Sequence, residues 1–209
     1  MKKRILSCIL IAVMLFTLTA CGGKTEDKEP AMGAFDSASL VYTNEFLGVK
    51  CQLEENWDVF DTERMSALQG LPAGYTNDEE LKELLDDEGS AQLFYAQADE
   101  GFQTLNIAVE DLGKVYGKLI DEKQYAQLSL DQVEPALEGV GFSVVSTEIT
   151  SMNFAGSSHT AIEIHGKLQD LDFYETLVCV KAGKYMALVT AGSYDTDVTK
   201  DLLGFFSSL

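Results

Sequence analysis

The sequence predicts a single α+β domain, in which a largely antiparallel β-sheet is covered by helices on both of its faces. Four strand-like segments follow one another between residues 142 and 193 with short turns, and strands connected so closely are antiparallel neighbours. The last of them, residues 184–193, is apolar or small on both of its sides. A strand with two buried sides lies at the centre of a sheet with helices on both faces, so this segment predicts a sheet between two helical layers.

The first half of the domain alternates short strands with two helices. The segments expected there are strands over residues 42–53 and 57–60, helices over residues 61–70 and from residue 76 onward, and a hairpin of residues 91–98 and 102–112. The first helix begins at an acid, Asp61, and ends at Gly70, as helices often do. Thr76 and Glu79 have the spacing of a capping box at the start of the second helix. Asp99–Gly101 is typical of a hairpin turn.

The second half begins with the longest helical segment, Asp121–Gly139, which we expect Pro135 to kink or split. The four strands follow, over residues 142–150, 159–168, 173–181 and 184–193. A final helix, capped by Thr196 or Asp197, is expected to cover one face of the sheet. Its apolar side chains are Leu202, Phe205, Phe206 and Leu209.

The first twenty residues have the pattern of a secretory signal peptide. Lys2, Lys3 and Arg4 precede the apolar run Ile5–Phe16, and small residues follow it. The run is shorter than the roughly 20 residues that a helix needs to span a bilayer. An uncleaved N-terminal anchor is the alternative interpretation of the same residues.

The segment Leu18–Cys21 resembles the lipobox of bacterial lipoproteins, which ends in an invariant cysteine. The resemblance implies cleavage after Ala20 and attachment of lipid to Cys21, and two or more acyl chains anchor a protein stably. The expected organisation is a signal peptide over residues 1–20, a flexible polar tether over residues 21–39 and the domain over residues 40–209. We therefore expect an extracytoplasmic protein that lipid holds at the outer face of the bacterial cell membrane.

The charge of the chain excludes one large class of partners. The chain has 34 acidic and 15 basic side chains and a formal net charge of −19. Removing the signal peptide, which carries three basic and no acidic side chains, takes the net charge to −22. Because phosphate binding needs a basic face, we expect no nucleic-acid partner.

The segment Tyr42–Val49, followed at a short distance by Trp57, resembles the opening of PsbP-like domains. Glu54 and Asn56 stand where those domains have a proline and a glycine. The resemblance implies a PsbP-like α/β/α sandwich, and the chain is also similar to uncharacterised lipoproteins of clostridia-like Firmicutes. Known relatives of the PsbP-like class are mostly non-enzymatic, so the resemblance implies no catalytic residues.

Two cysteines remain in the domain after processing and lipidation. Cys51 and Cys179 each lie within an apolar, strand-like run. Secretion permits a disulfide between them. Free cysteine also behaves as a small buried hydrophobe, and two separate buried thiols are the expected state.

The two histidines lie on one side of the same predicted strand. His159, Glu163 and His165 share one side of this strand, and Thr160, Ile162 and Ile164 lie on the other. About 20 Å of strand separates the two histidines, too far for a shared metal ion. Glu163 and His165 are close enough to form an ion pair or half of a weak metal site. We expect a solvated polar strand face, because no third ligand is in view.

The densest charge lies in the predicted helix that follows residue 76. Its acidic residues are Asp78, Glu79, Glu80, Glu83, Asp86, Asp87 and Glu88. The last three stand unfavourably at the C-terminal end of the helix, where its dipole is negative. The spacing is not that of an EF-hand. The patch is therefore a candidate interaction site for a cation or a basic partner, and a solvated helix face is the alternative.

Two functional hypotheses follow. The first is a non-catalytic binding module for an envelope protein or a small ligand, with no catalytic residue, cofactor or metal. The alternative is a cell-envelope enzyme of the glycan-hydrolase type, which needs two carboxylates about 5 to 9 Å apart. A groove with two facing carboxylates of raised pKa would favour the enzyme, and an apolar surface patch would favour the binding module.

Overall fold

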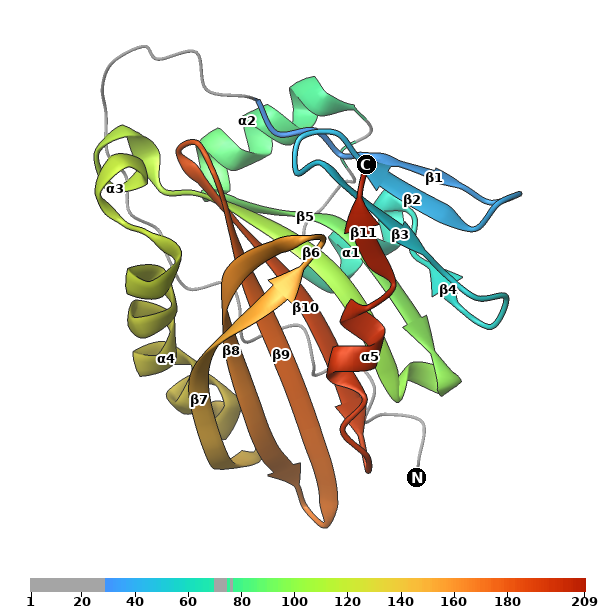
Figure 1. Cartoon of the computed structure of the whole chain (residues 1–209), viewed down its shortest axis with the longest axis vertical. Helices are drawn as coiled ribbons and strands as arrows, with labels where there is room; N and C mark the ends of the chain where they lie inside the picture. The colour runs from blue at the N-terminus through green and yellow to red at the C-terminus, as the bar shows by residue number, and fades with distance from the viewer. Residues whose placement is uncertain (1–28, 70–74, 76) are drawn as a thin grey trace.

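The computed structural model describes residues 29–69, 75 and 77–209, which build two antiparallel sheets and their covering helices (Figure 1). The larger sheet has the strand order β4-β5-β6-β10-β9-β8-β7. Its strands are β4 (Asp58–Val59), β5 (Ser90–Ala98), β6 (Gln103–Asp111), β7 (Phe142–Phe154), β8 (Ser157–Leu168), β9 (Leu171–Ala182) and β10 (Tyr185–Tyr194). β10 lies at the centre and is buried from Tyr185 to Ser193. The central strand predicted from its two apolar sides is thereby confirmed.

The smaller sheet contains strands from both ends of the described chain, β1 at one edge and β11 at the other. Its order is β1-β2-β3-β11, with β1 (Ala34–Asp36), β2 (Val41–Asn44), β3 (Val49–Gln52) and β11 (Phe206–Ser208). β1 pairs with β2, so the first strand of the fold lies within the segment that we expected to be tether.

The chain end differs from the expected final helix. Helix α5 spans only Thr199–Leu203, and the chain then turns at Gly204 and enters β11. Phe206 pairs with Cys51, so the chain end satisfies backbone groups at the edge of β3 rather than continuing as helix. Leu202 and Phe206 are buried as predicted, whereas Leu209 is exposed.

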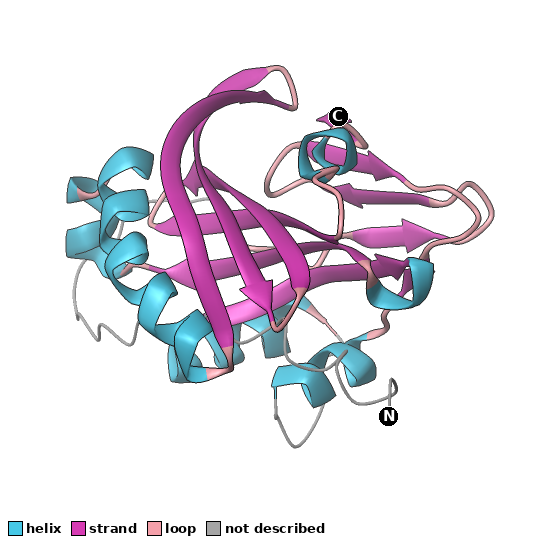
Figure 2. Cartoon of the chain, turned by 90° about the horizontal axis from the view of Figure 1, so that it is seen from below, coloured by secondary structure: helices cyan, strands magenta, loops and turns pink. Residues whose placement is uncertain are grey.

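Helices cover both faces of the larger sheet, as predicted. Helix α4 (Glu122–Gly139) packs on β7, β8 and β9, and its apolar side chains share a core cluster with Ile162, Leu177 and Met186. The opposite face carries α2 (Asp78–Glu88), α5 and the smaller sheet, which share a second core cluster. The larger sheet curves strongly between these two layers (Figure 2). The α+β class is confirmed, and the second sheet is an addition to the prediction.

The helix termini confirm some of the predicted caps and correct others. Helix α1 (Thr62–Gln69) begins at Asp61, whose carboxylate accepts the Arg64 N–H. Helix α2 is capped by Asn77, which accepts the N–H groups of Glu79 and Glu80, so the capping box placed at Thr76 was wrong by one residue; Thr76 itself lies outside the described residues.

Helix α4 is one continuous helix that contains Pro135, so the expected split does not occur. Asp121 and Gln124 form its capping box, in which each side chain accepts the other residue's backbone N–H. The short helix α3 (Gly113–Leu119), which the sequence did not predict, connects β6 to α4.

The two cysteines of the domain are separate thiols, as expected. Cys51 belongs to the core cluster beside the smaller sheet, and Cys179 belongs to the cluster under α4, on the opposite face of the larger sheet. Burial raises the pKa of each thiol to about 12. Cys21 and Ala20 lie outside the described residues. Within residues 29–69, 75 and 77–209, no helix has the length and apolar character of a membrane span.

Candidate binding site

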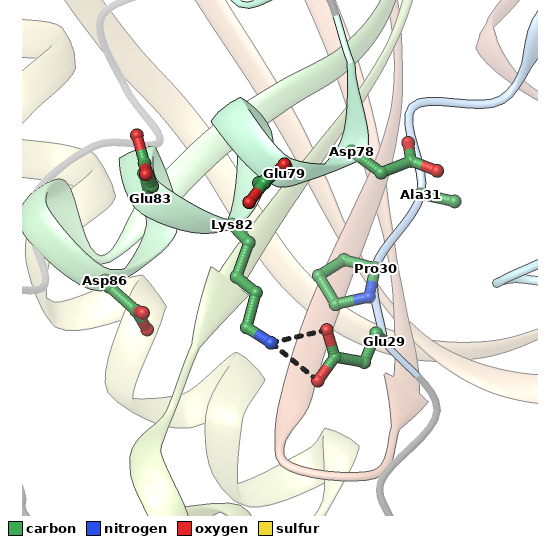
Figure 3. A pocket seen from close by; sticks show the side chains of 8 residues that line it. All are labelled: Glu29, Pro30, Ala31, Asp78, Glu79, Lys82, Glu83 and Asp86. Atoms are coloured by element: carbon green, nitrogen blue, oxygen red, sulfur yellow. Dashed lines mark hydrogen bonds and ion pairs between the residues drawn. The ribbon is translucent and has the colours of Figure 1, made fainter.

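The predicted acidic patch forms the outer surface of α2. All seven of its acids are exposed. Lys82, in their midst, binds both carboxylate oxygens of Glu29 at 2.8 and 2.7 Å, and Asp78 accepts the Met32 N–H at 2.9 Å. An open hollow of about 540 Å³ lies between α2 and residues 29–31 (Figure 3). Asp78 of the patch thus binds the start of the described chain to α2. The role of the patch as an interaction site stays a prediction.

The two histidines have separate carboxylate partners and are partly buried. His159 Nδ1 lies 2.8 Å from Glu122, and His165 Nε2 lies 2.7 Å from Asp172. Glu163 instead binds the Thr150 hydroxyl and Lys200. The expected solvated polar face is therefore wrong in part, because α4 and β9 supply carboxylates to it. In the described part of the chain, no group of three His, Cys, Asp or Glu side chains is arranged to hold a metal ion.

Glu122 occupies the point where β8 and β9 separate. The pairing of these strands ends at Thr160 and Cys179, although both strands continue beyond it. The Glu122 carboxylate accepts the Thr160 N–H at 3.0 Å and the Lys181 N–H at 3.1 Å, besides its contact with His159. The first turn of α4 thus supplies the hydrogen-bond acceptors that a neighbouring strand would otherwise provide.

A small pocket lies where β6 passes through α3 into α4. Gly113 has a positive φ of 68° and donates its N–H to Asp111, which turns the chain away from the sheet. At Gly117 a Cβ would lie 2.6 Å from the Lys184 Cα, so only glycine lets α3 approach the β9–β10 turn this closely. The cavity of about 30 Å³ that results, here called the Glu110 pocket, is lined by Glu110, Asp111, Leu112, Tyr116, Ile120, Tyr125 and Leu128.

Glu110 is the buried charge of this pocket. The residue is only 3% exposed, and its Oε2 atom has no hydrogen-bond partner among the described residues. Burial raises the pKa of the Glu110 carboxyl to about 7, although a hydrogen bond with the Tyr125 hydroxyl acts in the opposite direction. Asp111, next to it, forms an ion pair with Lys184. The pocket therefore contains one carboxyl that can gain or lose a proton near neutral pH.

The two helices beside the pocket carry exposed apolar side chains, and two of these, Tyr116 and Leu128, line the pocket itself. On α3, Val115 is 51% exposed, Tyr116 40% and Leu119 68%, and on α4 Leu128 is 48% exposed. Leu119 lies four residues after Val115 and three after Tyr116, so its side chain is a neighbour of each of them on the helix. We call these four residues the α3–α4 apolar surface. Grouped apolar side chains on an acidic domain are typical of a binding surface.

A second buried carboxyl lies elsewhere on the same face of the larger sheet. Glu175 on β9 is 4% exposed, and burial raises its pKa to about 8. It pairs with Gly192 of β10, whereas Glu110 pairs with Met186 of β10. Those positions are separated by about 20 Å of strand, beyond the 5 to 9.5 Å that paired glycosidase carboxylates span.

The sequence contained only part of the information needed to find this site. In the sequence, Glu110 ends a strand pattern in which Ile107 and Val109 alternate with other residues, and a solvent-exposed acid is equally compatible with that pattern. Helix α3 is too short, and too rich in glycine, to give a helical signal. One signal in the sequence could have indicated the surface. Val115, Tyr116 and Leu119 are apolar side chains that lie close to Gly113 and Gly117.

The molecule is thus a single α+β domain with an apolar surface around a buried carboxyl. Neither a scan against models of protein families nor a search of curated proteins gives a match. Solved structures similar to this chain include a cyanobacterial PsbP from Synechocystis, with 12% identity over 92% of this chain and 99% of that one, at a TM-score of 0.42.

Two further solved structures are similar at a comparable level. A protein from Bacteroides thetaiotaomicron has 8% identity and a TM-score of 0.43 over 87% of this chain, which spans about half (49%) of that protein. LpqN, involved in cell envelope biogenesis of Mycobacterium tuberculosis, has 13% identity and a TM-score of 0.39, over 76% of this chain and 82% of that one. PsbP is the class that residues 42–57 resemble. Similarities this distant carry no conclusion about ligand, partner or activity.

Proposed function

We propose that this chain is a non-catalytic binding module for a small ligand, which lipid on Cys21 holds at the outer face of the bacterial membrane. The observation that carries the proposal is the α3–α4 apolar surface, which opens onto the Glu110 pocket. Burial of exposed apolar side chains contributes about 25 cal/mol per Å² to binding. Sites for small molecules typically combine such apolar walls with a few polar groups, as this one does.

The alternative, an enzyme with paired carboxylates, receives less support from the geometry. The two buried carboxyls with raised pKa, Glu110 and Glu175, are about 20 Å or more apart along the sheet. A glycan hydrolase needs its two acids on opposite sides of one scissile bond. This separation favours the binding module.

The lipid anchor would hold the domain close to the membrane. Seven residues lie between Cys21 and Glu29, and the eight Cα–Cα steps that join the two span at most about 28 Å. Glu29 is bound to Lys82 on α2. We therefore expect the α2 side of the domain to lie nearest to the lipid surface, and its acids would discourage contact with anionic headgroups.

Replacing the lipid-bearing residue tests the location. We expect Cys21→Ser to abolish incorporation of labelled palmitate and to move the protein from the membrane fraction to the soluble fraction, because diacylglyceryl transfer requires the cysteine sulfur. Cys8→Ser, within the signal peptide, is the matched control and should leave retention unchanged. A Cys21→Ser protein that stays on the membrane through a carbonate wash would contradict lipid anchoring.

A neutral apolar dye tests the binding surface. Nile red should bind the mature chain with increased fluorescence, and the double variant Leu119→Ser, Leu128→Ser should bind it about tenfold more weakly, because two apolar contacts are lost. Val145→Ser on β7 is the control, since Val145 is 52% exposed but lies on another element. Equal binding by the parent and the double variant would overturn the assignment of this surface.

A further inference from the structure

We propose that the Glu110 pocket binds the ammonium group of an amphipathic amine, whose apolar part lies on the α3–α4 apolar surface. This inference rests on the proposed function and adds to it the chemical class of the ligand. Three properties of the pocket lead to it: its volume, its charge and the nature of its rim.

The volume fits one small polar head group. The cavity measures about 30 Å³, which is close to the share of one water molecule in the liquid. An ammonium group is of similar size, whereas a phosphate, a sugar ring or an aromatic ring is much larger. The rest of any ligand must therefore lie outside the pocket, against the exposed side chains of Tyr116 and Leu128, which also line the mouth.

The charge selects a cation. Glu110 and Asp111 both line the pocket, so an anionic head group would meet two acids. Lys184 is the basic group at this point, and its ion pair with Asp111 leaves Glu110 without a cationic partner among the described residues. The remaining titratable groups next to Glu110 are the Tyr125 hydroxyl, Tyr116 and the Cys179 thiol, none of which carries positive charge. A buried carboxylate without a cation is costly, and an ammonium group would supply both the charge and the hydrogen-bond donor that Oε2 lacks.

The proton equilibrium of Glu110 gives the binding a pH dependence. The carboxyl has a pKa of about 7, so below that pH an incoming cation must displace a proton. The affinity should therefore rise by up to about tenfold per pH unit below pH 7 and level off above pH 8, while an alkylamine keeps its charge up to about pH 10. A neutral ligand of the same shape should show no such rise.

Three six-carbon probes that differ only in the head group test the proposal. We would titrate hexylammonium, 1-hexanol and hexanoate into the mature chain, residues 21–209 with Cys21→Ser, and follow binding by calorimetry and by amide NMR shifts of α3. Hexylammonium should bind at least about tenfold more tightly than 1-hexanol, and hexanoate should bind most weakly. The dissociation constant obtained from the amide shifts of α3 should equal the one obtained by calorimetry.

Glu110→Gln separates the charge from the shape. It should weaken hexylammonium binding at least about tenfold and remove the pH dependence, while 1-hexanol binding stays within about twofold. Glu148→Gln, which changes an exposed glutamate of β7, should alter neither. Equal affinity for hexylammonium and 1-hexanol, or unchanged hexylammonium binding by Glu110→Gln, would overturn the proposal.

Nile red binding distinguishes failure of this proposal from failure of the proposed function. If Nile red still binds at the α3–α4 apolar surface in that case, the proposed function stands and only the ligand class fails. If Nile red binding does not depend on that surface either, both fail.

Discussion

Glu175→Gln is expected to raise the free energy of unfolding at pH 8 by about 3 to 5 kcal/mol and to change it little at pH 4. Glu175 is buried in the middle of β9, its Oε2 atom has no partner among the described residues, and burial raises its pKa to about 8 from an ordinary value of 4.5. Its neighbours across the sheet are Ile164 and Gly192, which offer no charge. Glutamine has the same shape and stays neutral at every pH.

The direction of the effect follows from proton linkage. Below about pH 4.5 the Glu175 carboxyl is protonated in both the folded and the unfolded chain, so it causes no penalty. As the pH rises from 4.5 towards 8, the unfolded chain loses this proton and the folded chain retains it, and the stability of the folded state falls. Glu110 adds a smaller loss of stability between pH 4.5 and pH 7, because burial raises its pKa as well.

Urea unfolding of the parent and of Glu175→Gln at pH 4, 6 and 8 measures this difference. All other carboxyls are common to both proteins, so the difference between their stabilities isolates Glu175. Glu148→Gln, at an exposed position of β7, is the control and should follow the parent. If the difference between Glu175→Gln and the parent did not change with pH, the raised pKa of Glu175 would be wrong.

Glu122→Ala is expected to lower the free energy of unfolding by about 2 to 5 kcal/mol. The variant removes the acceptor of the Thr160 and Lys181 N–H groups and of His159, at a partly buried position. Each N–H group that loses its partner inside the protein costs about 1 to 3 kcal/mol. The loss should be localised, because these contacts join the first turn of α4 to β8 and β9.

Urea unfolding, together with hydrogen exchange of the Thr160 and Lys181 amides, checks this second effect. Glu134→Ala on the exposed side of α4 is the matched control and should change stability by less than about 0.5 kcal/mol. A loss below 1 kcal/mol in Glu122→Ala, with both amides still protected from exchange, would show that the carboxylate does not hold β8 and β9 at their point of separation.

Both predictions concern acids that local patterns could not place. Glu122 stands in the first turn of a helix, where any acid interacts favourably with the helix dipole. Its contact with β8 and β9 depends on how α4 lies across a sheet whose strands come from 38 and 59 residues further along the chain. Glu175 lies in a predicted strand, but the pattern of β9 did not indicate that the helix layer would cover this position.

The sequence by itself determined the elements with strong local signals and the central position of β10. An apolar strand with two buried sides, strands joined by short turns, and a helix with a reciprocal cap at Asp121 and Gln124 all depend on interactions between residues near in sequence. The same holds for the separate thiols of Cys51 and Cys179, whose apolar surroundings were visible in the chain.

The tertiary structure alone decided the rest. β1 and β11 are three residues long, and each exists because a neighbouring edge strand offers hydrogen-bond partners. For this reason the final helix ends at Leu203, and residues 206–208, predicted to be helical, form β11. The Glu110 pocket arises where Gly117 lets α3 lie against the β9–β10 turn, which leaves the apolar side chains of α3 exposed and Glu110 buried. Burial depends on which elements meet, and a strand pattern with a period of two residues carries no information about them.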